Sequence, residues 1–228
     1  MKRFLRIITG VVAGLLGLAI GLLVLSRALG DHEVLYQGKS FYYWSEQSAS
    51  PLPALSNRAN AILNALIIPG LTNQMFSDTN DSAIRRTLVE QLNGLPGIHV
   101  DFTTGDARRV QAINHLAALG PKAGIAAPFL VEALKEDILC APAAGALVQV
   151  HADPEVVIPA LINCLVDRNG RGRADVVEAL AEFGPKSRAA VPALVKLLQD
   201  RSSKDIMLAV PKALKQIDPQ AAAEAGVK

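Results

Sequence analysis

The sequence predicts an all-α protein: an α-solenoid of stacked helical hairpins behind one N-terminal transmembrane helix. Half of the 228 residues are apolar and only 4% are aromatic, which favours thin, closely packed helices over β-sheets. An apolar pattern recurs every 31 to 34 residues in the C-terminal half, and a long uncharged run lies near the N-terminus. A chain of this length has room for one solenoid and an anchor, but not for two large domains.

The predicted anchor is the uncharged, mostly apolar run of 20 residues at positions 7–26, because about 20 such residues span the roughly 30 Å hydrocarbon core of a bilayer. Three basic residues precede the run and one follows it: Lys2, Arg3, Arg6 and Arg27. This excess predicts a single-pass segment with a cytoplasmic N-terminus and an extracytoplasmic (periplasmic) body. The alternative is a secretory signal cleaved after Gly30. The run is longer than a typical signal core, which favours the uncleaved anchor.

Four glycines lie in this run at spacings of four, three and four residues: Gly10, Gly14, Gly17 and Gly21. These spacings place them along one helical face, where a second helix could approach closely. A transmembrane homodimer is one interpretation. The other is that glycine is simply common in membrane helices.

Beyond the anchor the chain is close to neutral. The whole chain has a net charge of +2, but 19 basic residues face 21 acidic residues after position 30. Nucleic-acid binders usually carry a strongly basic domain or stripe, because phosphate neutralisation supplies most of their non-specific affinity. The sequence therefore predicts no nucleic-acid partner.

Aromatic residues gather just after the anchor, where Phe41 stands beside all three tyrosines and the single tryptophan: Tyr36, Tyr42, Tyr43 and Trp44. The preferred interpretation is a short helix that begins after Ser40 and closes the open end of the solenoid core, because repeat arrays need atypical capping units. An interfacial aromatic belt and an aromatic ligand platform are the alternatives.

Three segments superimpose without gaps when they are aligned on Pro128, Pro159 and Pro192, which stand 31 and 33 residues apart. Equivalent apolar residues lie two residues after each proline and nine and twelve residues before it: Leu130, Leu161 and Leu194; Leu119, Val150 and Phe183; Leu116, Leu147 and Leu180. Leu214 and Ile217 continue the series 34 residues later. Such a period, with helical offsets in both halves, indicates two antiparallel helices per repeat.

Prolines and glycines mark the expected helix ends. Each aligned proline is expected near the start of a second helix, where a missing N–H costs little. Gly120-Pro121 and Gly184-Pro185 are expected to separate two helices, and Asp153-Pro154 and Asp218-Pro219 to supply an N-cap followed by proline. Pro142 is expected in the first turn of the helix that contains Leu147.

The pattern decays upstream. Pro69, Leu71 and Met75 fit the second-helix template after an expected helix over 54–66, and together they predict one degenerate repeat. A further helix is expected over 82–93 and an irregular loop over 94–106. The predicted organisation comprises five parts: an N-terminal stretch 1–6, the anchor 7–26, a linker and aromatic cap 27–50, a degenerate region with a loop 51–106, and a solenoid 107–228 with about three clear repeats and a half unit.

Two motifs carry a resemblance to a known family. Leu119-Gly-Pro-Lys…Ala-Pro-x-Leu130 and Phe183-Gly-Pro-Lys…Val-Pro-x-Leu194 resemble HEAT repeats of the short, bacterial, phycobilisome-lyase-like type. The segments Tyr36-Gln-Gly-Lys-Ser-Phe-Tyr-Tyr-Trp44 and Ile217-Asp-Pro-Gln-Ala-Ala222 are similar to the opening and closing segments of membrane-tethered bacterial HEAT proteins. The resemblance covers residues 107–220 and implies an armadillo-like helical scaffold, which serves many functions in different proteins.

No pattern predicts a catalytic, cofactor-binding or metal-binding residue. The histidines are scattered, without a His or Cys pair at metal-ligand spacing: His32, His99, His115 and His151. His115 is expected to lie on a helix surface or to make an inter-repeat hydrogen bond.

For the remaining candidate residues, a structural role is preferred over a functional one. Gly170, Arg171, Gly172 and Arg173 form a basic turn, for which a solvated loop is preferred over a phosphate or acidic-peptide contact. Cys140 and Cys164 lie in apolar helical stretches and are expected to be buried thiols. A disulfide is the alternative if the body is extracytoplasmic.

The architecture favours a membrane-anchored scaffold that binds a protein partner on the concave surface of its solenoid. A lyase-like or small-molecule-handling protein is the alternative that the family name implies. A secreted soluble repeat protein after signal cleavage, and an envelope protein that self-associates through the glycine face, are two others. No enzymatic activity and no cofactor are expected.

Overall fold

The computed structural model describes residues 35–77, 83–95, 99–100, 102–167, 172–199 and 203–227. Helices dominate these residues and no strand occurs among them, so the all-α prediction is confirmed there. The predicted anchor, its four glycines and the Gly30 cleavage position lie outside the described residues. The chain divides into two compact units, Met1–Val34 with Thr79–Gly105 and Leu35–Asp78 with Asp106–Lys228.

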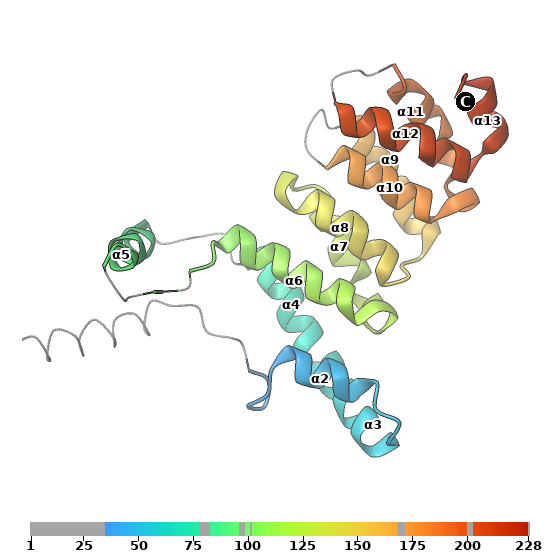
Figure 1. Ribbon diagram of the computed structural model, residues 1–228. Helices are drawn as coiled ribbons and strands as arrows, with labels where there is room; N and C mark the ends of the chain where they lie inside the picture. The colour runs from blue at the N-terminus through green and yellow to red at the C-terminus, as the bar shows by residue number, and fades with distance from the viewer. Residues whose placement is uncertain are drawn as a thin grey trace, which may run out of the picture. The chain divides into compact units, whose positions relative to one another are not determined.

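The larger unit consists of helical pairs in two layers. First helices are α2 (Phe41–Ser48), α6 (Gly105–Leu119), α8 (Asp137–Gln149), α10 (Arg173–Glu182) and α12 (Lys204–Ile217). Second helices are the run α3 (Pro53–Ile62), η1 (Leu63–Ile67) and α4 (Ile68–Ser77); η2 (Gly120–Ala126) with α7 (Ala127–Ala133); α9 (Pro154–Asp167); η3 (Gly184–Ala190) with α11 (Val191–Leu197); and α13 (Pro219–Glu224). Figure 1 shows α12, α10, α8 and α6 following one another, with α11, α9 and α7 behind them.

Three repeats follow from this order: α6 with η2 and α7, α8 with α9, and α10 with η3 and α11. The core between the layers contains the residues that the aligned pattern predicted. The leucines twelve residues before and two residues after each proline are all fully buried: Leu116, Leu147, Leu180, Leu130, Leu161 and Leu194. Leu214 and Ile217 are buried in the same way in α12. Each pair therefore buries its apolar face against its neighbours, as a solenoid requires.

Residues in the left-handed backbone conformation occur at the turns between first and second helices. Gly120 and Gly184 each have a φ of +59° and begin η2 and η3, which confirms both predicted helix boundaries. His151 occupies the equivalent position, eight residues before the aligned proline, with a φ of +53°. Glycine adopts this region without cost, whereas a residue with a side chain is strained there.

In the second repeat no 3₁₀ helix precedes the second helix, α9. Asp153 accepts a hydrogen bond from the Glu155 N–H (3.0 Å) just before α9 begins at Pro154. This geometry confirms the predicted N-cap and moves the helix start upstream of the aligned proline. Pro159 is consequently the sixth residue of α9 and not a first-turn residue.

The aligned prolines of the other repeats, Pro128 and Pro192, do lie in the first turns of α7 and α11. The prediction for Pro142 is wrong, because α8 begins at Asp137 and Pro142 is its sixth residue. The extended backbone of Glu136 starts this helix one turn earlier than the proline suggested. Each interior proline removes one i→i−4 hydrogen bond from its helix.

The degenerate repeat differs from its prediction, because α3, η1 and α4 continue into one another without a turn. A π-helical turn, Leu63–Ile67, precedes Pro69, and the Ile68 N–H donates to the Leu63 carbonyl five residues back. Pro69 has no N–H to donate, and the wider turn before it lets the helical run continue through the proline. The partner of this long run is α2, which packs against α3 and η1.

Helix α2 confirms the predicted capping helix. The Ser40 Oγ accepts a hydrogen bond from the Tyr43 N–H (3.2 Å), and Phe41 and Trp44 are buried in the core. The Trp44 indole donates to the Tyr36 carbonyl (2.7 Å). His115 of α6 stacks on Phe41 with ring centroids 4.2 Å apart, so its contact with the cap is made through its ring.

A buried arginine joins this cap region to the first repeat. The Arg109 Nε donates to the Met75 carbonyl at the end of α4 (2.6 Å), and its guanidinium pairs with Glu136. Arg173 stands at the equivalent position, nineteen residues before the aligned proline, and is also buried. The prediction of a solvated basic turn is therefore wrong for Arg173, while residues 168–171 lie outside the described part of the chain.

The C-terminal half unit begins with α12 and ends with α13. Asp218 caps α13 by accepting a hydrogen bond from the Ala221 N–H (3.1 Å), as predicted. The Arg188 Nε of η3 donates to the same carboxylate (2.7 Å). The hydrogen bond from Arg188, followed by that from the Ala221 N–H, holds the pKa of Asp218 below its usual value.

The smaller unit contains α5 (Ala83–Asn93), which confirms the helix expected over 82–93 where the chain is described. The Asn93 side chain donates to the Val100 carbonyl (3.1 Å) and accepts from the Val100 N–H (2.7 Å). Val89, Leu92 and Val100 bury one another beside this clamp. The described residues of the expected loop are not helical before α6 begins at Gly105.

Within the described residues, Gly105–Ala133 has the length and hydropathy of a candidate membrane span. It is divided among α6, η2 and α7 by the left-handed turn at Gly120. It supplies both arms of the first repeat, and 33% of its most apolar window is buried.

Candidate binding face

The second helices expose the same aligned positions in all three repeats. The residues three before the aligned proline are Ile125, Val156 and Ala189, and each is exposed, with fractions of 59% for Ile125 and 60% for Val156. The next residue along the chain is buried in each repeat: Ala126, Val157 and Ala190. Exposure of an apolar residue at this aligned position is thus a property that all three repeats share.

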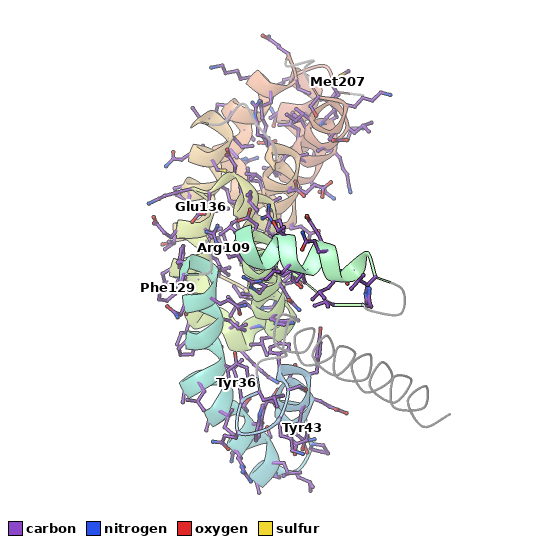
Figure 2. The ribbon with its side chains drawn as sticks, turned by 90° about the vertical axis from the view of Figure 1, so that its left-hand side faces the viewer. Tyr36, Tyr43, Arg109, Phe129, Glu136 and Met207 are labelled. Atoms are coloured by element: carbon purple, nitrogen blue, oxygen red, sulfur yellow. The ribbon has the colours of Figure 1, made fainter. Side chains whose placement is uncertain are left out.

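The aligned prolines belong to the same face. Positions three residues apart lie on one side of a helix, and all three prolines are exposed. Phe129 adds a ring that is 45% exposed and lies toward the left-hand edge of Figure 2. We call this set the proline face: Ile125, Pro128, Phe129, Val156, Pro159, Ala189 and Pro192.

A groove of about 620 Å³ lies in the proline face between α9 and η3. Its apolar lining comes from Pro154, Ile158, Pro159 and Ala189. The third repeat carries the small Ala189 where the others carry Ile125 and Val156, and this difference leaves room beside Pro159.

Charged residues of both signs surround the apolar part of this groove: Asp153, Glu155 and Lys186. An apolar centre with a polar rim is the usual anatomy of a protein–protein interface. Contiguous apolar surface that faces solvent also marks interaction sites. The proline face can therefore bury apolar side chains of a partner and offer charged groups at its edge.

Two other hollows are chemically different. One of about 360 Å³ lies between α10 and α12, where Asp175, Glu178 and Asp205 outnumber Lys212. The other, of about 220 Å³, lies at the cap beside Tyr43 and Trp44.

The cations of the cap hollow are engaged with its aromatic rings. The Lys39 Nζ lies 5.1 Å from the Tyr43 ring centroid, and the Arg58 guanidinium lies 5.9 Å from that of Trp44. Contacts of this length stabilise the cap itself. They support the capping interpretation of these aromatics over a ligand platform.

The structure brings no histidines together among the residues it describes. His115 stacks in the cap, His151 forms a turn, and His99 lies in the smaller unit. His32 lies outside the described residues. Across the described chain, no group of three or more His, Cys, Asp or Glu side chains is placed to hold a metal ion.

Cys140 and Cys164 are both buried, and their Sγ atoms lie 3.0 Å apart. Their predicted burial is confirmed, and they lie as close together as the alternative of a disulfide would require. The repeat alignment carries the signal, because the two cysteines stand nineteen residues before and five residues after the same proline, Pro159. The equivalent pairs of the other repeats are also buried: Arg109 with Ala133, and Arg173 with Leu197.

Stacked pairs of antiparallel helices, repeated in register, define the chain as an α-helical repeat protein. A family model of HEAT repeats matches residues 158–225, which extend from α9 to α13. The resemblance to HEAT repeats is therefore confirmed for this part of the chain. No curated protein and no solved structure matches the chain significantly. HEAT repeats generally mediate protein–protein interaction.

Proposed function

We propose that the chain is a non-enzymatic scaffold that binds another protein along the proline face. The observation that carries the proposal is the exposure of apolar residues at matched positions of three successive second helices. A repeat array presents such positions as one extended surface, so a single polypeptide can contact several repeats at once. The apolar groove with its charged rim supports the same assignment.

Site-specific photo-crosslinking in the cells that produce the protein tests this face. A photoreactive residue is placed at Ile125 or Val156 in the full-length chain. Matched controls carry it at Ile138 of α8 or Leu208 of α12, which are 51% and 75% exposed in the layer of first helices. We expect the same partner adduct from both proline-face positions and not from the controls. Equal adducts from all four positions, or none from the proline face, would refute the assignment.

A pair of charge substitutions tests the energetics. Phe129→Asp places a carboxylate in the proline face, and Ile138→Asp places one at a similarly exposed apolar position outside it. We expect Phe129→Asp to weaken binding about tenfold or more, because loss of an interface hot spot costs about 2 kcal/mol or more and about 1.4 kcal/mol corresponds to tenfold. Ile138→Asp should leave the affinity unchanged, and equal losses from both variants would contradict the proposal.

We further propose that residues 7–26 anchor this scaffold, with the N-terminus in the cytoplasm and the repeats outside it. The support is the uncharged run with three basic residues before it and one after it. Protease added to intact cells or spheroplasts should then remove a C-terminal tag. A protected tag would contradict this orientation, and a mature N-terminus at Asp31 would show a cleaved signal instead.

The glycine face of this segment is proposed to pair two copies of the anchor. The support is the spacing of Gly10, Gly14, Gly17 and Gly21, which allows close helix approach. Crosslinked dimers of the full-length protein in membranes should disappear in Gly14→Ile and persist in Ala13→Ile. Dimers that survive Gly14→Ile would contradict pairing through this face.

A further inference from the structure

We propose that Cys140 and Cys164 form an intrachain disulfide under oxidising conditions, which locks the middle helical pair of the array. The Sγ–Sγ distance of 3.0 Å is only about 1 Å longer than a disulfide bond of about 2.05 Å. A small approach of two side chains therefore suffices. This site is separate from the proline face, and its chemistry does not depend on any partner.

The two cysteines lie at the end of the helical pair that is not closed by a connection between the helices. Cys140 lies in the first turn of α8 and Cys164 in the last turn of α9. The two helices are joined at their other ends by the short connection through His151 and Asp153. A disulfide would close the open end of this helical pair, so the pair could not separate without stretching the bond.

The repeat alignment makes the pairing specific. The chain has only two cysteines, and both occupy a pair of aligned positions at which the first and second helices meet. The first repeat holds Arg109 and Ala133 at these positions, and the third holds Arg173 and Leu197. Cysteine has replaced both members of the pair in the middle repeat and occurs nowhere else.

The surroundings leave space for the sulfur atoms. Gly172 is the N-cap residue just before α10 and has a φ of +89°. A Cβ at that position would lie 3.4 Å from the Cys140 Sγ and 3.3 Å from the Ala141 N. The Cys164 thiol also donates to the Leu134 carbonyl, 3.7 Å from its Sγ.

Thiol–disulfide exchange with a low-molecular-weight disulfide such as oxidised glutathione supplies the oxidant. Cys164 is 7% exposed and Cys140 fully buried, so the Cys164 thiolate attacks first and releases one glutathione. The Cys140 thiolate then attacks the Cys164 Sγ, forms the protein disulfide and releases the second glutathione. Each cysteine loses its proton to water, and each released glutathione thiolate gains one. Two protein thiols are oxidised and one small disulfide is reduced to two thiols.

The test uses the full-length protein, reduced and then equilibrated with oxidised glutathione. Trypsin leaves both cysteines in one peptide, residues 136–168, and cleavage after Glu155 divides it into 137–155 and 156–168. A disulfide holds these two peptides together, so mass spectrometry should find the linked pair until reductant is added. Neither cysteine should react with iodoacetamide after unfolding of the oxidised protein.

A thermal measurement provides the second readout. The crosslink should raise Tm by about 5 °C or more, because it restricts the unfolded chain. Reductant should reverse the shift, and Cys164→Ser should show no shift under the same treatment. Two alkylated cysteines after oxidation of the folded protein and after refolding in glutathione buffer would overturn the proposal. Disulfides found only between chains or only with glutathione would overturn it too.

Discussion

The left-handed turns allow a prediction in which one substitution has opposite effects at two places. Gly184 has a φ of +59°, and Gly145 lies in the interior of α8 with an ordinary helical φ. A Cβ added at either position meets no atom within 4 Å. Gly→Ala therefore tests backbone conformation alone, without a packing contribution.

The magnitudes follow from the two backbone states. A left-handed conformation costs an L-residue about 1–2 kcal/mol, and the loss of glycine's freedom in the unfolded chain returns about 0.4–1 kcal/mol. Gly184→Ala should thus reduce the free energy of unfolding by about 1 kcal/mol. Pro185 adds to this cost by restricting the residue before it. Gly145→Ala should increase stability by about 0.5–1 kcal/mol, since alanine is the better residue inside a helix.

His151 completes the test, because it holds the same left-handed position with Ala152 in place of a following proline. That difference makes a residue with a side chain tolerable there. His151→Gly should stabilise the protein, and His151→Ala should be about 1 kcal/mol less stable than His151→Gly. Urea unfolding followed by far-UV circular dichroism measures all four variants. Equal signs for Gly184→Ala and Gly145→Ala would refute the reasoning.

Three further predictions concern packing and charge. Leu147→Ala should cost about 2–5 kcal/mol, because it empties a fully buried site, whereas Leu208→Ala at a 75% exposed site should change stability by less than about 0.5 kcal/mol in urea unfolding. A double-mutant cycle with Arg109→Met and Glu136→Gln should give a coupling energy of about 1 kcal/mol or less, because Glu136 is 43% exposed. Asp218→Asn keeps a good N-cap but removes the charge that Arg188 binds. Because the pKa of Asp218 is lowered on folding, the stability difference between wild type and Asp218→Asn should be constant above about pH 5, shrink as the pH falls below about 4, and vanish below the folded pKa. A difference that is unchanged by acid in pH-dependent unfolding would contradict that assignment.

Local patterns were sufficient to predict the repeat core, and the reason is physical. Apolar side chains at helical spacing must face a neighbour, so Leu147 and Leu161 could be assigned to the core from their spacing alone. Capping is equally local, because Ser40 and Asp218 satisfy backbone donors within three residues of themselves. Such features need no knowledge of which helices meet.

Prolines were harder to interpret, because the same residue has two meanings. Pro128 starts a helix, whereas Pro142 and Pro159 lie inside helices that begin one turn earlier. The start of each helix is set by a residue upstream of the proline. Glu136 ends the extended backbone before α8, and the Asp153 side chain caps α9. At Pro69 the helix continues because a π-helical turn, Leu63–Ile67, precedes the proline. No simple sequence pattern predicts such a turn.

The burial of polar residues could not be predicted from local patterns, because it depends on contacts between helices and repeats. Arg173 belongs to a charged segment of the sequence, and only its alignment with Arg109 indicates that a guanidinium is buried at this position. The two cysteines are hidden for the same reason, because their meeting depends on how two helices cross. Alignment of the repeats on one another, position by position, would have indicated both.

The same position-by-position comparison shows how the proline face changes along the array. Three residues before the proline, the side chain shrinks from Ile125 through Val156 to Ala189. Apolar area buried on binding contributes roughly 25 cal/mol per Å², so the first two repeats have more to offer an apolar partner than the third. The groove lies where the second repeat meets the third, beside Ala189. A partner that fits this face therefore needs an apolar concavity opposite the first repeats and a protruding apolar side chain opposite Ala189.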